Sequence, residues 1–175
     1  AEPDVDALKT YYARYELTRW LAELSSTVAK TPKVNVVYDT ILTEAALQVW
    51  IDKLKAAGVF AVDTETTSLN YMKADIVGVS FSVKPGEAAY VPLAHDGVGA
   101  PKQLDRDKTL LALKPLLEDA SYKKIGQHIK YDIEVFANAG IDLQGADYDT
   151  MLESFVLDSQ ATRHDMDSLA SHYLN

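Results

Sequence analysis

Two acidic residues, Asp63 and Glu65, stand one residue apart directly after the apolar stretch 59–62. Residues two apart on a β-strand point to the same face, so the two carboxylates would project together and repel each other. Hard divalent cations such as Mg²⁺ and Mn²⁺ prefer oxygen ligands and would neutralise this charge. The pair therefore predicts either a solvated strand end or a metal site, and an isolated Asp-x-Glu is too common to decide between them.

A third acid, Asp132, lies in the stretch GQHIKYD, where a predicted strand leads into a helix that Gly140 ends. Ligand sites in open α/β sheets lie at the carboxyl ends of strands. If this helix packs beside the strand of Asp63, Asp132 approaches the pair, and three acids make a better cation site than two. The alternative is that Asp132 only stabilises the positive N-terminal end of its helix.

Helical and extended patterns alternate along the chain, which predicts an α/β domain with a mixed sheet. Thr43 and Gly58 bound a predicted helix, and the unbroken apolar run 59–62 predicts a strand covered on both faces. Strands at 76–83 and 88–94 flank the turn KPGE and form a hairpin. The other expected elements are a helix over 104–119 with Asp105 as its cap and a kink or restart at Pro115, strands at 122–128 and 144–149, and helices capped by Asp149 and Asp165.

Length and composition fit one compact domain with an extension. The chain has 175 residues, 47% of them hydrophobic, and no cysteine, so disulfides and thiolate metal sites are excluded. Residues 1–24 are predicted to form a helix and 25–33 a linker, which separates an N-terminal extension, 1–33, from a domain over 34–175. No apolar run is long enough to span a membrane, so a membrane partner is not expected. No secretory signal is visible and the chain has no cysteine, with which a cytoplasmic location fits.

The net charge of −9 argues against a simple binding module for single strands, which needs a basic groove. It leaves open a protein that presents carboxylates to metal ions, which in turn meet phosphates.

Three stretches, FAVDTETTSL, GQHIKYD and DTMLESFVLDSQATRHDMDSLA, together resemble the proofreading 3′–5′ exonuclease domain of bacterial family A DNA polymerases. The resemblance runs in order from Val34 to the last residue, through AAYVPLAHD and LLALKPLLED. It implies an RNase H-like (DnaQ-like exonuclease) fold with a mixed five-stranded sheet flanked by helices. YYARYELTRW resembles the end of the 5′-nuclease region, which would make residues 1–33 a segment outside the exonuclease fold.

The resemblance also implies chemistry with two divalent cations, Mg²⁺ or Mn²⁺, about 4 Å apart. Asp63 would bridge both ions, Glu65 would hold the ion that carries the attacking water, and Asp132 would hold the second. Hydrolysis of the terminal phosphodiester at the 3′ end of single-stranded DNA would release a nucleoside monophosphate. The implied partners are that DNA and a polymerase domain on the same polypeptide, in the bacterial cytoplasm with the nucleoid.

Four further residues match substrate contacts of the family, two of them with a plainer alternative. Leu69 would pack against the terminal base, and Gln127 would touch the sugar or phosphate. Tyr131 would stack on the strand or brace it, unless it belongs to the core. Arg163 would contact a phosphate, unless it is an ordinary surface residue.

The sequence departs from the family pattern at two points. His128 stands where the family usually has Asn, and we interpret it as a substrate contact or a plain substitution, not as a general base, although it lies four residues before Asp132. The family's third motif, Tyr-x-x-x-Asp, has no match after Arg163. Tyr71 and Asp75 have this spacing, but they lie just after the first motif, which is the wrong place in the chain. A fourth carboxylate is then missing, the domain is C-terminally incomplete, and we expect little or no exonuclease activity from this chain alone.

Two other functions remain open at this point. One is a non-catalytic remnant of the same domain, although the presence of Asp63, Glu65 and Asp132 speaks against it. The other is an RNA exonuclease of the same superfamily, because the first motif alone does not separate DNA from RNA.

Overall fold

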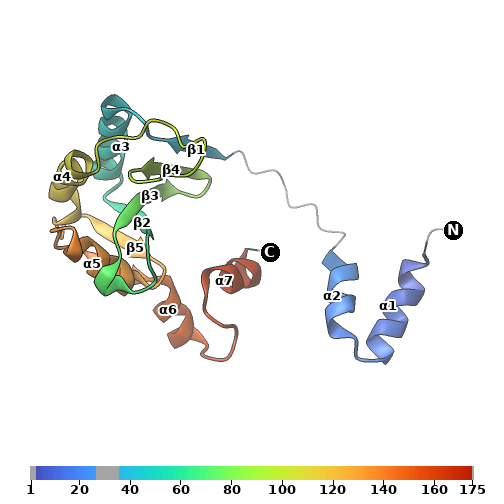
Figure 1. Cartoon of the computed structure of the whole chain (residues 1–175). Coiled ribbons are helices and arrows are strands. Elements are labelled where there is room, and N and C mark those ends of the chain that lie inside the picture. Colours follow the sequence, from blue (N-terminus) through green and yellow to red (C-terminus); the bar gives the residue numbers. More distant parts are fainter. Residues whose placement is uncertain (1–2, 27–35, 175) are drawn as a thin grey trace. The chain divides into compact units, whose positions relative to one another are not determined.

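The computed structural model describes residues 3–26 and 36–174, and the chain divides into two compact units, Ala1–Val34 and Asn35–Asn175. The first unit holds α1 (Val5–Arg14) and α2 (Thr18–Ser26) (Figure 1). The single helix predicted over 1–24 is therefore wrong. Glu16 takes a left-handed backbone conformation that ends α1, and the rings of Tyr12 and Trp20 meet at 5.6 Å. Most of the predicted linker 25–33 lies outside the described residues.

The second unit is built on a mixed sheet, as predicted, with six strands instead of five. The order is β1-β4-β3-β2-β5-β6, with β3 antiparallel to β2 and β4 and the other neighbours parallel. The additional strand, β1, is a short edge strand that pairs with β4, and it was not predicted although Val37, Tyr38 and Thr40 are residue types common in strands. The strands are β1 (Val37–Thr40), β2 (Val59–Thr66), β3 (Ile76–Lys84), β4 (Glu87–Pro92), β5 (Lys123–Gly126) and β6 (Ala146–Asp149).

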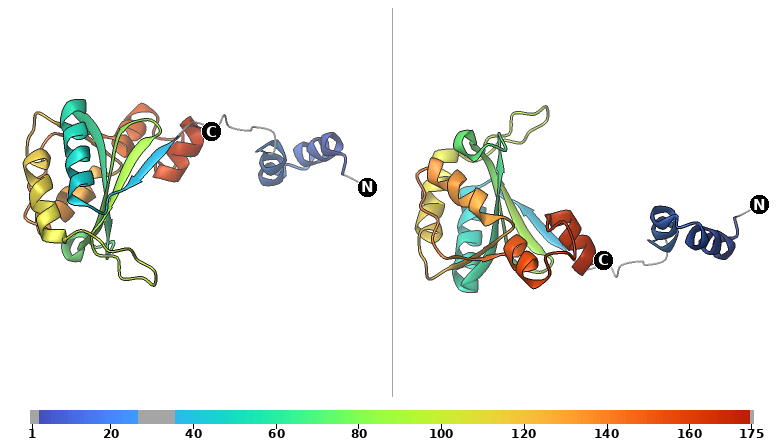
Figure 2. Two further views of the ribbon diagram at one scale, coloured as in Figure 1. Left: turned by 90° about the horizontal axis from the view of Figure 1, so that it is seen from above. Right: turned by 90° about the horizontal axis from the view of Figure 1, so that it is seen from below.

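One face of this sheet, called here the closed face, packs against α3 (Glu44–Ala57), α4 (Arg106–Leu117) and α5 (Ile129–Asn138) (Figure 2). The strands contribute large apolar side chains to it, among them Phe60, Val62 and Phe81. The predicted caps Thr43 and Asp105 each accept a bond from their helix, and Gly58 ends α3 in a left-handed conformation. α4 runs through Pro115 as one helix, without the restart that was considered.

The opposite face, called here the open face, is covered in part by α6 (Thr150–Leu157) and α7 (Met166–Tyr173). A pocket of about 720 Å³ remains between this face and the two helices, and the strand side chains that line it are small or polar except for Ile125. The prediction that β2 is covered on both faces is therefore wrong for this face. The pocket is lined from the sheet by Ala61, Asp63, Ser80, Ser82, Ala88 and Ile125.

Over the described parts of the chain, every helix is too short or too polar to pass through a membrane.

Candidate active site

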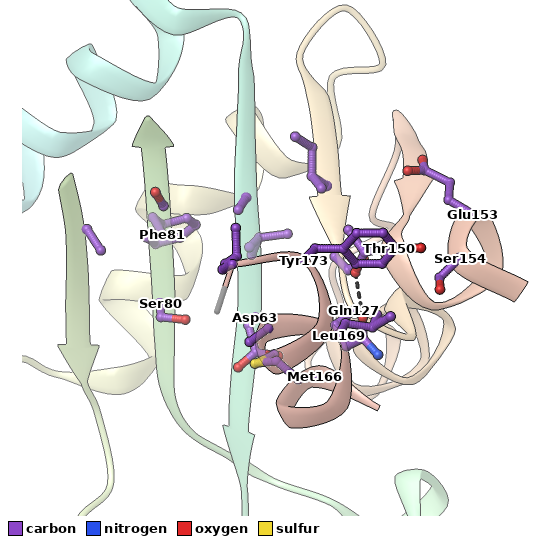
Figure 3. Close-up of a pocket in the computed structure, with 18 of the residues that line it drawn as sticks. Asp63, Ser80, Phe81, Gln127, Thr150, Glu153, Ser154, Met166, Leu169 and Tyr173 are labelled. Carbon is purple, nitrogen blue, oxygen red and sulfur yellow. Dashed lines mark hydrogen bonds between the residues drawn. The ribbon is translucent and has the colours of Figure 1, made fainter. Parts of the chain in front are cut away.

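Asp63 lies near the end of β2 and points to the open face, where it lines the pocket beneath α7 (Figure 3). Its side chain is half-buried. Burial raises the pKa of the Asp63 carboxyl, and the negative charge of Glu65 raises it further. Glu65 is exposed at the same end of the strand. Asp63 and Glu65 therefore lie at the same strand end, where the charge of Glu65 acts on the Asp63 carboxyl.

Asp132 lies in the first turn of α5 and is 2% exposed. Its Oδ1 accepts two hydrogen bonds from Thr64, one from the backbone N–H at 2.9 Å and one from the hydroxyl at 2.6 Å. Thr64 points to the closed face, so Asp132 reaches the end of β2 from the side opposite Asp63. Sequence reasoning missed Thr64, because its role as the hydrogen-bond partner of Asp132 is visible only once α5 lies beside β2.

The pKa of Asp132 is raised to about 6, mainly by burial and also by the charge of Asp63, against the effect of the Thr64 bonds. The three predicted acids thus share one strand end and influence each other electrostatically. Within residues 3–26 and 36–174, however, no three His, Cys, Asp or Glu side chains are arranged closely enough to hold a metal ion. A cation held by all three acids at once would therefore require their side chains to move.

The loop after β2 presents Leu69 with 96% of its surface exposed. Tyr131 braces this loop, because its hydroxyl shares a hydrogen bond of 2.6 Å with the Thr66 hydroxyl and donates to the Ser68 carbonyl. The side-chain amide of Asn138 donates to the backbone carbonyl of Tyr71, in the short helix η1 (Tyr71–Lys73). Tyr131 also packs against the hydrophobic core, which agrees with the plainer alternative, and its contact with a DNA strand stays a prediction.

Gln127 has both ends of its amide group engaged inside the protein. Its Nε2 donates to the His164 carbonyl at 2.8 Å, and its Oε1 accepts from the Thr150 hydroxyl at 2.5 Å. The next residue, His128, has an exposed side chain and a left-handed backbone with φ 57°. Asn and His are both enriched among residues that adopt this conformation, which explains how His takes the place of Asn here.

Asp149 caps two helices at once. Its carboxylate accepts the backbone N–H groups of His128 and Ile129, at the start of α5, at 3.0 and 3.1 Å. It also accepts those of Met151 and Leu152, at the start of α6, at 3.0 and 3.3 Å. The prediction that Asp149 caps a helix is confirmed, and the carboxylate also ties α6 to the helix that carries Asp132.

The stretch before α7 holds two basic residues with different surroundings. Arg163 is exposed, and its Nε lies 3.4 Å from an oxygen of Asp165, which caps α7 as predicted. His164 is buried, with Nδ1 2.9 Å from the Ser154 hydroxyl and Nε2 3.2 Å from the Ser159 carbonyl. His164 therefore holds the loop against α6, a structural role that its sequence neighbours do not reveal.

Comparisons with known proteins agree with this geometry. Residues 38–175 match the family model of the 3′–5′ exonuclease of DNA polymerase A. DNA polymerase I of Pseudomonas aeruginosa is 54% identical over 99% of this chain and 20% of its own length. The chain thus spans about a fifth of the length of this curated relative.

Two solved structures share the fold at 22% identity. The polymerase domain of Mycobacterium smegmatis Pol1, in complex with DNA primer-template and dNTP, superposes with a TM-score of 0.59 over 78% of this chain and 22% of its own. Brucella melitensis NrnC with bound Mg²⁺ gives a TM-score of 0.56 over 81% of this chain and 62% of its own. The predicted RNase H-like fold is confirmed, and the chain belongs to the family of 3′–5′ exonuclease domains of DNA polymerase I.

Proposed function

We propose that this chain is the part of a DNA polymerase I that removes mispaired nucleotides from the 3′ end of single-stranded DNA, using divalent cations. The observation that carries the proposal is that Asp63 and Glu65 of β2, and Asp132 of α5 through its bonds to Thr64, lie at the same strand end in a chain of this family. The DNA substrate is favoured over RNA because the curated relatives are DNA polymerases. Such a substrate would place the protein with the bacterial nucleoid.

The side chains at the strand end suit a divalent cation in their chemistry. Burial and the charge of a neighbouring acid raise the pKa of both Asp63 and Asp132. A bound cation would stabilise the charged form of both carboxylates. Asp63, Glu65 and Asp132 would hold two ions of Mg²⁺ or Mn²⁺. When bound, the ions would supply Lewis-acid neutralisation of the scissile phosphate.

The residues around the acids would position the DNA. Leu69, held outward on a braced loop, offers an apolar surface for the terminal base. The exposed Arg163 and His128 are available to phosphate oxygens. Gln127 would contact the substrate only by giving up an internal bond, so we propose that it mainly fixes the strand β5 against α6.

Residues 1–33 lie before the matched exonuclease segment, yet the alignment with the Pseudomonas polymerase covers 99% of the chain. We therefore propose that they form the end of the 5′-nuclease region. In the longer polypeptide, the polymerase domain would be the partner of this exonuclease domain. The chain alone is expected to be weakly active or inactive, because its sequence offers three of the four carboxylates that the family uses.

A chimera tests this function. The matching segment of Pseudomonas aeruginosa DNA polymerase I is replaced by this chain, and release of 3′-terminal nucleotides from a labelled single strand is followed with and without Mg²⁺. We expect Mg²⁺-dependent release that Asp63→Asn abolishes and that the exposed control Leu111→Ala leaves unchanged. Equal rates for the chimera and its Asp63→Asn variant would refute an active role for this strand end. Faster release from RNA of the same sequence would favour the ribonuclease alternative.

A further inference from the structure

A tyrosine outside the three sequence motifs, Tyr90, lies close to Glu65, and its hydroxyl contacts a histidine, His95. Glu65 pairs with Gly78 of β3 across the antiparallel ladder, and Tyr90 of β4 pairs with Ser80. A Cβ atom built on Gly78 would lie 1.9 Å from the Tyr90 hydroxyl oxygen. That hydroxyl therefore occupies the space directly above Gly78. Side chains of directly opposed residues point to the same face, so this space adjoins the side chain of Glu65.

The requirement for glycine at position 78 is thus steric, and it concerns one side chain. Gly78 is the residue that lets the ring of Tyr90 lie diagonally across β3 towards β2. Any other residue at 78 would displace the hydroxyl from the neighbourhood of Glu65. The charge of Glu65, after burial, also raises the pKa of Tyr90, in agreement with this proximity.

The hydroxyl of Tyr90 is in turn held by His95. Its oxygen lies 2.5 Å from His95 Nε2, and the two rings lie 5.7 Å apart. The backbone of His95 is fixed in both directions by one amide side chain. His95 N–H donates to Gln103 Oε1 at 2.8 Å, and Gln103 Nε2 donates to the His95 carbonyl at 2.6 Å. Gln103 thus fixes the exposed loop around His95 in a position where His95 Nε2 contacts the Tyr90 hydroxyl.

We propose that Tyr90, held by His95, is a positioning residue for Glu65. In this arrangement His95 carries its proton on Nε2 and donates it to the Tyr90 oxygen. The Tyr90 O–H is then free to donate to the Glu65 carboxylate and fix its orientation. The opposite arrangement, in which Tyr90 donates to an unprotonated Nε2, leaves Glu65 without this bond. The proposal rests on the function proposed above, because it assigns Tyr90 and His95 to the support of one acid of that site.

Such support matters because Glu65 is exposed and lies at the end of a strand, with freedom that the buried Asp132 lacks. Hydrogen bonds to a ligating carboxylate orient it, and their removal costs about tenfold or more in metal affinity or activity. Tyr90→Phe is therefore expected to weaken Mn²⁺ binding about tenfold and to lower kcat with KM for the oligonucleotide unchanged. His95→Ala should have the same effect, and His95→Gln, which keeps a donor near the Nε2 position, should restore most of it.

The test uses the 175-residue chain for structure and Mn²⁺ binding, and the Pseudomonas chimera for turnover. Long-range ¹⁵N spectra of the imidazole report which nitrogen of His95 is protonated, and Mn²⁺ titration reports affinity at Glu65. Tyr38→Phe, at a position 71% exposed on β1, is the matched control and should behave as the wild-type chain. Circular dichroism checks that each variant is folded.

The outcomes separate the two proposals. An Nδ1–H tautomer for His95, or a Tyr90→Phe variant that binds Mn²⁺ as tightly as the Tyr38→Phe control, would overturn the positioning role. Loss of Mn²⁺-dependent turnover in Asp63→Asn with normal turnover in Tyr90→Phe would overturn it too, while leaving the exonuclease function intact. If the wild-type chimera released nucleotides no faster than its Asp63→Asn variant, the exonuclease function would be refuted. The positioning role of Tyr90 would still be tested by the tautomer of His95.

Discussion

The two faces of the sheet are built from different residues, although the same strands supply both. On the closed face, β2 and β3 present Phe60, Val62 and Phe81, each no more than 2% exposed. The alternate residues of the same two strands point to the open face. They are Ala61, Asp63, Ser80 and Ser82, which are small or polar and line a pocket of about 720 Å³. The closed face even buries Lys124, whose ammonium group donates to the Asp119 carbonyl at 2.8 Å.

This difference indicates a division between stability and chemistry. A wholly packed face resists change, since interiors are close-packed and tolerate few voids. The open face keeps space at the carboxyl end of β2, where Asp63 and Glu65 lie. Asp132 belongs to the closed face by its burial and by its bonds to Thr64, yet its charge acts on the same strand end. The site therefore lies across the boundary between a rigid face and an open one.

The largest expected effect on stability is the loss from truncating a leucine on the closed face, compared with a leucine truncated on the open face. Leu113 of α4 is 0% exposed, whereas Leu157 of α6 lines the pocket and is 75% exposed. Leu113→Ala is expected to lower the free energy of unfolding by about 2–5 kcal/mol, because it leaves a cavity in a packed core. Leu157→Ala should change it by less than about 0.5 kcal/mol. Urea denaturation followed by circular dichroism measures both, and similar losses would contradict the assignment of a closed and an open face.

The next effect concerns the charge of Asp132 in a metal-free solution containing a chelator. Burial raises the pKa of Asp132 from 3.8 to about 6, so the folded protein binds this proton more tightly than the unfolded chain does. The stability that the protonated carboxyl contributes is therefore lost as the pH rises from about 4 to about 6. Because one pKa unit corresponds to about 1.4 kcal/mol and the shift is about two units, Asp132→Asn should be more stable than the wild-type chain by about 3 kcal/mol above pH 7.

Near pH 4 the two proteins should unfold at nearly the same urea concentration, because Asp132 is then neutral in the folded state. Unfolding curves at intervals of pH give the comparison. A stability difference that stays constant from pH 4 to pH 8 would show that the charge of Asp132 is not the cause.

How much of this could be predicted from the sequence differs between the faces as well. The closed face follows from local patterns: Thr43, Gly58 and Asp105 mark helix ends by their own chemistry, and all three are found there. The acids of the site were found because strand alternation places Asp63 and Glu65 on one side. The edge strand β1 was missed although Val37, Tyr38 and Thr40 favour a strand, because a stretch of four residues is recognised as one only by its pairing with β4.

Residues whose role depends on distant partners could not be predicted in the same way. The acceptor role of Asp149 at α5 requires β6 to lie beside β5, a contact between residues about 20 positions apart. The place of Tyr90 beside Glu65 depends on the absence of a side chain at Gly78, which no pattern in the sequence indicates. The open face was misjudged because an apolar run that includes Ala61 looks continuous, although alanine leaves space on its side of the sheet.

A smaller effect is expected where one carboxylate joins the two faces. Asp149→Ala removes the acceptor of four backbone N–H groups, shared between α5 on the closed face and α6 on the open face. Loss of a helix cap costs about 1–2 kcal/mol. Amide hydrogen exchange should accelerate more in α6, where Ser154 is the buried residue, than in α5, which is held by several. Asp165→Ala, which removes a single cap bond to Ser168, is the control and should affect α7 alone.

The smallest effect on stability, and a distinct effect on binding, is expected at Leu69. Its side chain is 96% exposed, so Leu69→Ala should leave the free energy of unfolding within about 0.5 kcal/mol of the wild-type value. If the braced loop is a platform for the terminal base, the same substitution removes an apolar contact worth about 1 kcal/mol, or about fivefold in affinity. Fluorescence anisotropy with a labelled single-stranded DNA, in Ca²⁺ to suppress cleavage, measures that loss. Leu111→Ala, at a position 69% exposed on the far helix α4, loses a similar side chain and should bind normally. Equal affinities for the two variants would show that Leu69 is exposed without being a base contact.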